Sequence, residues 1–332
     1  MITSGWKNKY NVTNMPKSRE FLELMKVHSS VIDATYSFFA GKGLFHVNVP
    51  LTTSSASSPM GPGSDSAPVS AVISNGTVLL TDSAQFYLEY ACRATESGCY
   101  YYGHSFRDEE PDKRHLSQFS HIEAEIPGDL PAVKALVEEF VIYLSDFLLN
   151  KNRDILSQQP NSVERITDLL NNKRFTTVSF DEALRLLENV PGAIKECVSG
   201  HYVVTAVGEH WLTDKFGIVW LENWDRLTVP FYQAKDSKSG RAINADMLFP
   251  TVGEVVGAGQ RHTAYYNVLC ALEEQGVSPE AYQWSVDMKK DYPLPTSGFG
   301  IGVERYLMWL LNVDDIRSVE LFSRRRDQSG EI

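Results

Sequence analysis

The sequence predicts an α+β fold in which an antiparallel β-sheet is flanked by helices. Strand-like segments follow one another with only loops between them, as in the pair within residues 101–126 and in the runs 217–224, 229–235 and 243–257. The helical patterns gather around these runs and do not alternate with single strands. Regular alternation would favour a parallel sheet, so this grouping favours an antiparallel one.

The composition is typical of a soluble globular protein. Of the 332 residues, 43% are hydrophobic and 22% are charged, and no apolar run is long enough to cross a membrane. The four cysteines are scattered without a CxxC pair, which indicates reduced thiols and a cytoplasmic protein. The net charge of −11 disfavours binding to DNA or RNA through a broad basic surface, but it leaves room for a local basic patch.

The N-terminal part predicts a leader, a helix, a strand and a loop, in that order. We expect residues 1–18 to form a short leader and the apolar periodicity of 19–41 to form an amphipathic helix. A strand within 44–51 is interrupted by Pro50. Ser, Pro and Gly dominate 52–68, which predicts a loop that is either a lid over a site or a plain surface connection.

The remaining segments complete one domain, which we expect to span residues 19–332. Within it, residues 150–215 alternate helical patterns with polar turns and predict an inserted helical subdomain. The other predicted elements are a strand at 77–80 and helices at 83–94, 129–149, 262–275 and 303–312.

The hairpin within residues 101–126 is the first candidate site. Strand alternation puts Phe119, His121, Glu123 and Glu125 on one face and apolar residues on the other. Arg107 lies where the first strand passes into a loop crowded with charges. A guanidinium can clamp a phosphate and an aromatic ring can stack on a base, so this face is suited to a nucleotide. The alternative is a solvated face of ion pairs.

The second candidate site is the segment SGFGIGVERYLMWLL, residues 297–311. Gly298, Gly300 and Gly302 alternate on one side of a short strand and leave a face without side chains, against which a flat ligand can lie. Arg305 follows at the start of a helix whose apolar residues face the core. The spacing differs from that of a GxGxxG dinucleotide loop, so the glycines alone are weak evidence for a ligand site. The Glu-Arg pair and the core helix that follow them make this evidence stronger.

The third candidate site is the segment ADMLFPTVGEVVGAGQRH, residues 245–262. Asp246 and Glu254 are hard oxygen ligands in an apolar stretch, and such ligands suit a Mg²⁺ ion that bridges phosphates. The alternative is a pair of acids on an edge strand. Arg261 follows a glycine-rich turn.

Together these passages resemble the catalytic core of class II aminoacyl-tRNA synthetases, in particular the aspartyl/asparaginyl subgroup, from about residue 20 to 326. FHVNVPLTT with Pro50 resembles motif 1, FRDEEPDKRHLSQF resembles motif 2, and GFGIGVERYLMWLLNVDDIRSVELFSR resembles motif 3. PTVGEVVG and SAQFYLEYAC are similar to the asparaginyl branch, because Leu88 stands where aspartyl enzymes carry a lysine and Glu89 follows it.

The resemblance implies the roles of individual residues. Arg107 and Arg305 would be the catalytic pair: Arg107 would hold the α-phosphate, while Arg114 and His115 would reach the terminal phosphates with Arg305 opposite them. Arg261 and Glu89 would bind the carbonyl oxygen and the NH₂ group of an amide side chain. The implied ATP site comprises Arg107, Glu109, Arg114, His115, Phe119, Gly300, Gly302 and Arg305; the amino-acid site Ser83, Gln85, Glu89, Glu123 and Arg261; and the metal site Asp246 and Glu254.

The sequence also departs from the subgroup. Subgroup members carry an N-terminal anticodon-binding domain, which we do not expect here because so few residues precede the core. Thr296-Ser297 stand where the family has His-Gly, and Val229-Pro230 stand where it has a lysine before Phe-Tyr. The ATP machinery therefore resembles the family more closely than the amino-acid pocket does.

We accordingly predict an ATP-dependent ligase that uses Mg²⁺ and activates Asn, Asp or a close analogue as the aminoacyl-adenylate. Its acyl group would pass to ammonia or another small amine, as in an asparagine-synthetase-related paralogue or a tailoring enzyme. One alternative is a truncated asparaginyl-tRNA synthetase-like enzyme that charges tRNA or a carrier, against which the acidic charge counts. The other is a non-catalytic regulator that binds an amino acid or adenylate. A homodimer through motif 1, around Pro50, is the expected assembly.

Overall fold

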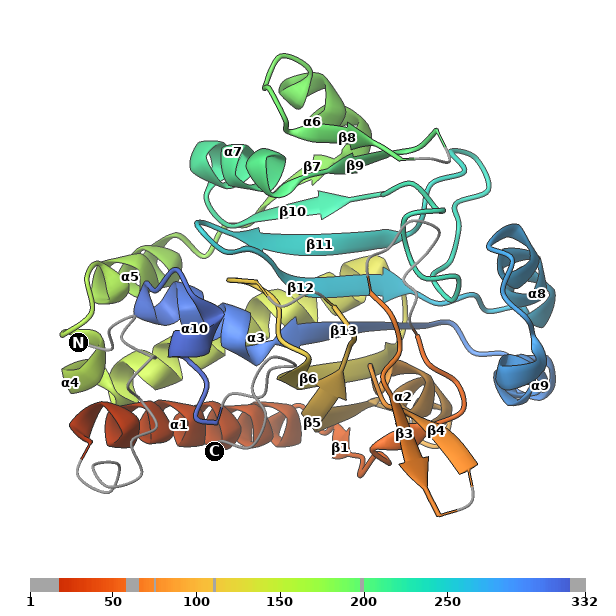
Figure 1. Cartoon of the computed structure of the whole chain (residues 1–332), viewed down its shortest axis with the longest axis horizontal. Helices are drawn as coiled ribbons and strands as arrows, with labels where there is room; N and C mark the ends of the chain where they lie inside the picture. The colour runs from red at the N-terminus through yellow and green to blue at the C-terminus, as the bar shows by residue number, and fades with distance from the viewer. Residues whose placement is uncertain (1–17, 58–65, 75, 110–111, 198–199, 323–332) are drawn as a thin grey trace.

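The computed structural model describes residues 18–57, 66–74, 76–109, 112–197 and 200–322 (Figure 1). Residues 1–17 of the predicted leader and the middle of the predicted loop at 52–68 lie outside the described residues. None of the described helices is both long enough and apolar enough to cross a membrane.

An eight-stranded sheet organises the fold, in the order β1-β5-β6-β13-β12-β11-β10-β7. Strands β5 to β10 in this order pair antiparallel, while β1 and β7 pair parallel at the two edges. The strands are β1 (Phe45–His46), β5 (Cys99–Phe106), β6 (Gln118–Pro127), β7 (Thr176–Ser179), β10 (Val219–Glu222), β11 (Asn244–Phe249), β12 (Gly253–Gln260) and β13 (Thr296–Gly302). With helices on both sides, this sheet confirms the predicted α+β class.

The main hydrophobic core lies between one side of the sheet and a layer of helices. This layer consists of α1 (Arg19–Gly41), α3 (Leu130–Lys151), α5 (Ser162–Asn172) and α10 (Val303–Leu311). Ile122 and Ala124 of β6 and Phe299 of β13 point into this core. Because strand residues alternate between sides, Glu123 and Gly300 lie on the opposite side.

The opposite side is covered only in part. Helix α2 (Gln85–Cys92) packs near β6 and β13, and α7 (Ala206–Phe216) packs on β10 and β11 with its own smaller core. Helices α8 (Tyr265–Glu274) and α9 (Gln283–Asp291) lie together beyond one end of the sheet (Figure 1). The polar side of the central strands is therefore framed by these helices.

Some segments differ from the prediction. The run 229–235 forms isolated bridges at Gln233 and Lys235 and no strand, because Pro230 has no amide hydrogen to donate to a ladder. The run 243–257 is two strands, β11 and β12, joined by a tight turn in which Thr251 has a φ of 69°. The remaining elements are β2 (Thr52–Thr53), β3 (Ser70–Ile73), β4 (Gly76–Leu80), α4 (Arg153–Leu156), α6 (Phe180–Leu187), β8 (Ile194–Glu196), β9 (Tyr202–Val204), and short 3₁₀ turns at Glu280–Tyr282 and Ile316–Ser318.

The segment 150–215 contains α4 to α7 and also three strands, of which β7 joins the edge of the main sheet and β8 pairs with β9. Side chains of α6 and α7 form a small core of their own with β10. One residue of this segment, Glu209 of α7, pairs with Arg114 of the site described next.

Candidate active site

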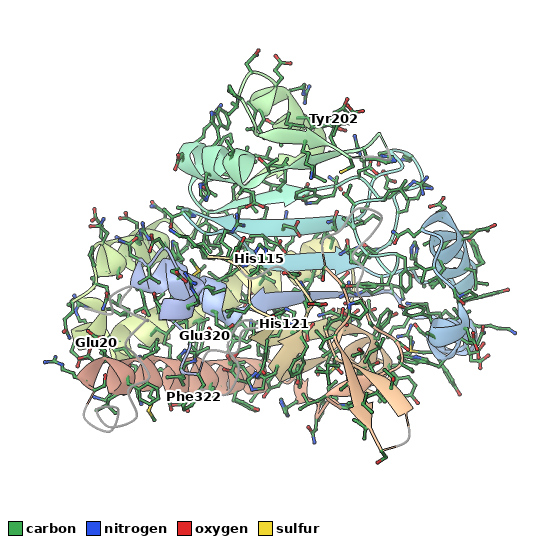
Figure 2. The ribbon with its side chains drawn as sticks, in the orientation of Figure 1. Glu20, His115, His121, Tyr202, Glu320 and Phe322 are labelled. Carbon is green, nitrogen blue, oxygen red and sulfur yellow. The ribbon has the colours of Figure 1, made fainter. Side chains whose placement is uncertain are left out.

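A cavity of about 280 Å³ opens on the polar side of the central strands. Figure 2 shows His115 and His121, which both line it, near the middle of the molecule. Every predicted site residue except Glu89 also lines it: Ser83, Gln85, Arg107, Glu109, Arg114, His115, Phe119, Glu123, Asp246, Glu254, Arg261, Gly300, Gly302 and Arg305. Segments more than 200 residues apart in the chain thus meet in one place.

One end of the cavity combines an arginine with an aromatic ring. The Arg107 guanidinium lies over the Phe119 ring, with 5.3 Å between its Cζ and the ring centroid. The Arg107 Nε is buried and has no hydrogen-bond partner among the described residues. A buried donor without a partner is costly, so this geometry favours an anionic ligand that accepts from it.

Two further arginines lie near Arg107 on the cavity wall. Arg305 donates from Nη1 to the Glu254 carbonyl oxygen at 2.9 Å and from Nε to the Arg114 carbonyl oxygen at 3.3 Å. Arg114 donates from Nη2 to Glu209 Oε2 at 2.8 Å. Backbone carbonyls from two other segments therefore hold the Arg305 side chain in the cavity.

Carboxylates lie beside these arginines, since Glu254 Oε2 is 3.8 Å from Arg305 Nη1 and Glu209 pairs with Arg114. Burial and the nearby charges of Glu254 and Glu209 raise the pKa of Asp246 well above its ordinary value. A Cβ added to Gly257 would lie 3.3 Å from Glu254 Oε1 and 3.7 Å from Asp246 Oδ1, so both acids flank this glycine. In the described part of the chain no three His, Cys, Asp or Glu side chains are arranged to hold a metal by themselves.

Asp246 and Glu254 nevertheless fit Mg²⁺. This ion is usually held in proteins by one or two carboxylates, together with water and substrate phosphates. A cation between the two acids would relieve the repulsion that raises the pKa of Asp246. Sequence reasoning missed Glu209, since it lies on α7 without a recognisable motif and only the packing of that helix brings it here.

Glu123 is the centre of the other end of the cavity. Its carboxylate accepts from Ser83 Oγ at 2.5 Å, from the Ala84 amide at 2.7 Å and from Gln85 Nε2 at 3.4 Å. Burial raises the pKa of Glu123 to about 7, although these hydrogen bonds oppose the rise. An ammonium group bound here would favour the charged carboxylate.

Glu125, the next residue of β6 on the same side as Glu123, pairs with Arg261, which directly follows β12. Its Nε lies 3.2 Å from both Glu125 oxygens, its Nη2 donates to Glu125 Oε2 at 2.9 Å, and its Nη2 also donates to Gln85 Oε1. A Cβ on Gly298 would collide with this carboxylate and would lie 2.6 Å from Arg261 Nη2. The predicted glycine face on β13 is therefore what allows the Arg261–Glu125 pair to form.

Glu89 is the one predicted site residue that does not line the cavity. Its carboxylate accepts from the buried Lys289 Nζ and from Arg93 Nη2, at 3.3 Å for the latter. Lys289 comes from α9, and burial lowers its pKa, so it needs a counter-ion. A lysine in a polar helix gave no sign of this burial in the sequence.

His121 lines the cavity between Phe119 and Glu123 and carried no role in the sequence-based assignment. Its Nδ1 lies 3.0 Å from Ser105 Oγ. Burial, aided by the charge of Arg107, lowers the pKa of His121 to about 3. The imidazole is therefore neutral at pH 7. The alternation along β6 had placed it on this face, but a single histidine does not reveal its environment.

Comparison with known proteins gives consistent matches. The family model described as tRNA synthetases class II (D, K and N) matches residues 4–326. Asparagine–tRNA ligase of Thermoplasma acidophilum is 28% identical over 93% of this chain and 70% of its own length. Asparagine–tRNA ligase of Pyrococcus furiosus is 32% identical over 74% of this chain and 56% of its own.

Solved structures of asparaginyl-tRNA synthetases also match this chain. Asparaginyl-tRNA synthetase of Pyrococcus horikoshii, complexed with asparaginyl-adenylate, superposes with a TM-score of 0.85 at 26% identity, over 95% of this chain and 71% of that one. Asparaginyl-tRNA synthetase of Entamoeba histolytica has a TM-score of 0.84 at 22% identity, over 98% and 72% of the two chains, and this similarity concerns the fold alone.

Proposed function

The chain belongs to the class II tRNA synthetases of the D, K and N group, which are ATP-dependent ligases, and on this premise we propose that it activates asparagine as the aminoacyl-adenylate. The observation that carries this proposal is the cavity itself. It joins an arginine over an aromatic ring, a second arginine, two acids and a carboxylate suited to an ammonium group.

In the proposed first step a carboxylate oxygen of the amino acid attacks the α-phosphorus of ATP, and the bond to pyrophosphate breaks. Phe119 stacks on the adenine and Arg107 donates to the α-phosphate, where charge develops. Arg305, Arg114 and His115 hold the leaving pyrophosphate. Glu109 contacts the adenine end from the loop that follows β5.

Mg²⁺ fits Asp246 and Glu254, and when bound it would supply positive charge to the phosphates. Glu123 binds the α-ammonium group of the amino acid, while Ser83 and Gln85 fix the carboxylate of Glu123 for this contact. The carboxylate of the substrate is thereby directed along β6 toward Arg107.

For the second step we propose transfer of the asparaginyl group to a tRNA hydroxyl. The comparisons favour this acceptor over the small amine that the sequence ranked first, because the matched relatives are tRNA ligases. The net charge of −11 is the observation that keeps ammonia or a small amine as the second candidate.

We also propose that two copies of the chain pair through α1 and the segment around Pro50. Large apolar side chains on the outer face of α1 support this assembly: Leu22, Met25, Ile32 and Tyr36 are all more than a third exposed. Such a row on a single helix is suited to packing against another helix.

The activity is tested by asparagine-dependent exchange of pyrophosphate into ATP. We expect exchange with the native chain and a loss of at least about 100-fold in kcat/KM for Arg107→Ala, since this residue stabilises the developing charge. Arg185→Ala is the matched control, because Arg185 lies exposed on α6 and away from the cavity. Absence of exchange with every amino acid would contradict the proposal.

The acceptor is tested separately, with ATP, Mg²⁺ and labelled asparagine in the presence of either tRNA or ammonia. We expect an acid-precipitable product with tRNA that ribonuclease destroys. A ribonuclease-resistant small amide formed from ammonia, with no charged tRNA, would instead establish the amine acceptor.

A further inference from the structure

Gln233 is a cavity residue to which neither the motifs nor the proposed chemistry has given a role. It lies in the irregular segment after Pro230 and forms an isolated antiparallel bridge with Arg261. Residues paired in this way project their side chains to the same side, about 5 Å apart at Cβ. Gln233 is therefore an immediate neighbour of the arginine at the amino-acid end of the cavity.

The amide group of Gln233 packs against the backbone of β12 at Gly259, which has no side chain. A Cβ added to Gly259 of β12 would lie 2.9 Å from Gln233 Cδ and 3.2 Å from its Nε2. Gly259 thus lets the planar amide lie close to the strand. The Oε1 atom is buried without a hydrogen-bond partner in the part of the chain that the structure describes. Buried acceptors are rarely left unpaired, so this one calls for a donor on the ligand.

The charges around this corner cancel before a ligand binds. Arg261 is buried against the carboxylate of Glu125, and Glu123 is set to receive the α-ammonium group of the amino acid. A substrate side chain that carried its own negative charge would enter a desolvated corner in which the neighbouring cation, Arg261, is already paired with Glu125. A neutral side chain that both accepts and donates hydrogen bonds meets no such penalty.

A primary carboxamide satisfies both neighbours at once. Its carbonyl oxygen accepts from the Arg261 guanidinium, and its NH₂ group donates to Gln233 Oε1. The order of residues along β6 places the amide there. Glu123 holds the α-ammonium group, and the next residue on that face, Glu125, holds Arg261, about 7 Å further along the strand.

We infer that Gln233 is a specificity-determining residue, which together with Arg261 selects an amino acid with a carboxamide side chain over one with a carboxylate. The inference rests on the proposed function, since it takes the amino acid to lie between Glu123 and Arg261. Gln233 thereby fills the role that the sequence assigned to Glu89, whose carboxylate is held by Lys289.

The test compares Gln233→Met and Gln233→Glu with the native chain in pyrophosphate exchange, using asparagine and aspartate. Methionine keeps the length of the side chain but removes both polar groups. It should raise the KM for asparagine at least tenfold and lower the asparagine-to-aspartate ratio of kcat/KM by a similar factor, with the KM for ATP within twofold. Glutamate keeps the acceptor and adds a negative charge that repels aspartate. This variant should therefore keep its activity with asparagine and raise the asparagine-to-aspartate ratio of kcat/KM.

Gln283→Met is the matched control, because Gln283 is exposed on α9 and bonds only to Asp287 in the described chain; it should change neither ratio nor KM. Thermal melting establishes that each variant is folded. Should Gln233→Met fail to fold, the asparagine-to-aspartate ratio of the near-isosteric Gln233→Glu variant tests the inference by itself.

An asparagine-to-aspartate ratio of kcat/KM that is unchanged in the folded variants, or a native preference for aspartate, would overturn the inference while leaving adenylate formation intact. A native chain that shows no exchange with any amino acid would overturn the proposed function and this inference together.

Discussion

At the scale of single residues, the ion pair with Lys289 gives Glu89, a predicted site residue, a structural partner. Both side chains are almost fully buried, at 2% and 1% exposure. Lys289 Nζ also donates to the His262 carbonyl oxygen at 2.9 Å. Its positive charge is therefore satisfied from two segments. The pair ties α2 to α9 behind the cavity.

We predict that Glu89→Gln destabilises the protein by about 3–5 kcal/mol, because it leaves the Lys289 ammonium buried without a counter-charge. Urea denaturation measures this change. The double variant Glu89→Gln with Lys289→Met is the control, and it should recover most of the loss since the buried ammonium is gone and Arg93 still donates to the Glu89 and Tyr292 carbonyl oxygens. A Glu89→Gln protein with native stability and an altered preference between asparagine and aspartate would return Glu89 to the substrate site.

At the scale of elements, local patterns predicted what depends on local sequence. The periodicity of residues 19–41 gave a helix with the same bounds as α1, and the alternation along 119–126 put the polar residues of β6 on the cavity side. Both features follow from residues a few positions apart, which is the range over which periodicity acts.

What the sequence could not supply depends on contacts between distant segments. Gln233 and Arg261 are neighbours only because an irregular segment bridges to the end of β12, and Glu209 pairs with the cavity-lining Arg114 only through the packing of α7. Pro230 also prevented the strand that the apolar character of 229–235 suggested. The type of a single residue does not reveal whether its side chain is buried or which distant residue it contacts.

The outer face of α1 carries a prediction about assembly. Leu22, Met25, Ile32 and Tyr36 recur at intervals of three, seven and four residues, which align along one side of a helix, while Leu24 and Val31 face the core. Figure 1 shows α1 along the lower edge of the molecule, with none of the labelled helices and strands below it. This row is the proposed contact between two copies.

We expect Ile32→Glu to raise the dissociation constant of the dimer at least about 100-fold, because it places a charge in an apolar interface. Sedimentation or light scattering over a range of concentrations measures the change. Asn171→Glu, which adds the same charge on the exposed side of α5, is the control and should remain dimeric. A native chain that is monomeric at every concentration would refute the proposed assembly.

At the scale of the whole molecule, several titratable groups are buried in or next to the cavity: Glu123, Glu304 and His121 line it, and His262 directly follows the cavity-lining Arg261. Burial raises the pKa of both Glu123 and Glu304 to about 7. It also lowers the pKa of His121 to about 3 and that of His262 to about 4. Each shift makes the stability of the fold depend on pH, since the unfolded chain keeps ordinary values.

The signs of these contributions differ. A carboxyl with a raised pKa holds a proton in the folded state that the unfolded state releases, so its contribution is lost as pH rises from about 4.5 through 7. A histidine with a lowered pKa loses stability as pH falls below about 6.5, because the unfolded state then binds a proton that the folded state refuses. The two effects oppose each other below pH 6.5, and only the carboxyls act above it.

We therefore predict that the unfolding free energy falls between pH 6.5 and 8.5, by roughly 1 kcal/mol for each of Glu123 and Glu304. Glu304→Gln isolates one contribution, because its amide oxygen can still accept from the Ser120 amide, which lies 3.0 Å from both carboxylate oxygens in the native chain. Urea denaturation at both pH values should show a smaller decline in the variant by about that amount. An identical decline in the variant would mean that Glu304 is already ionised in the folded protein at pH 6.5.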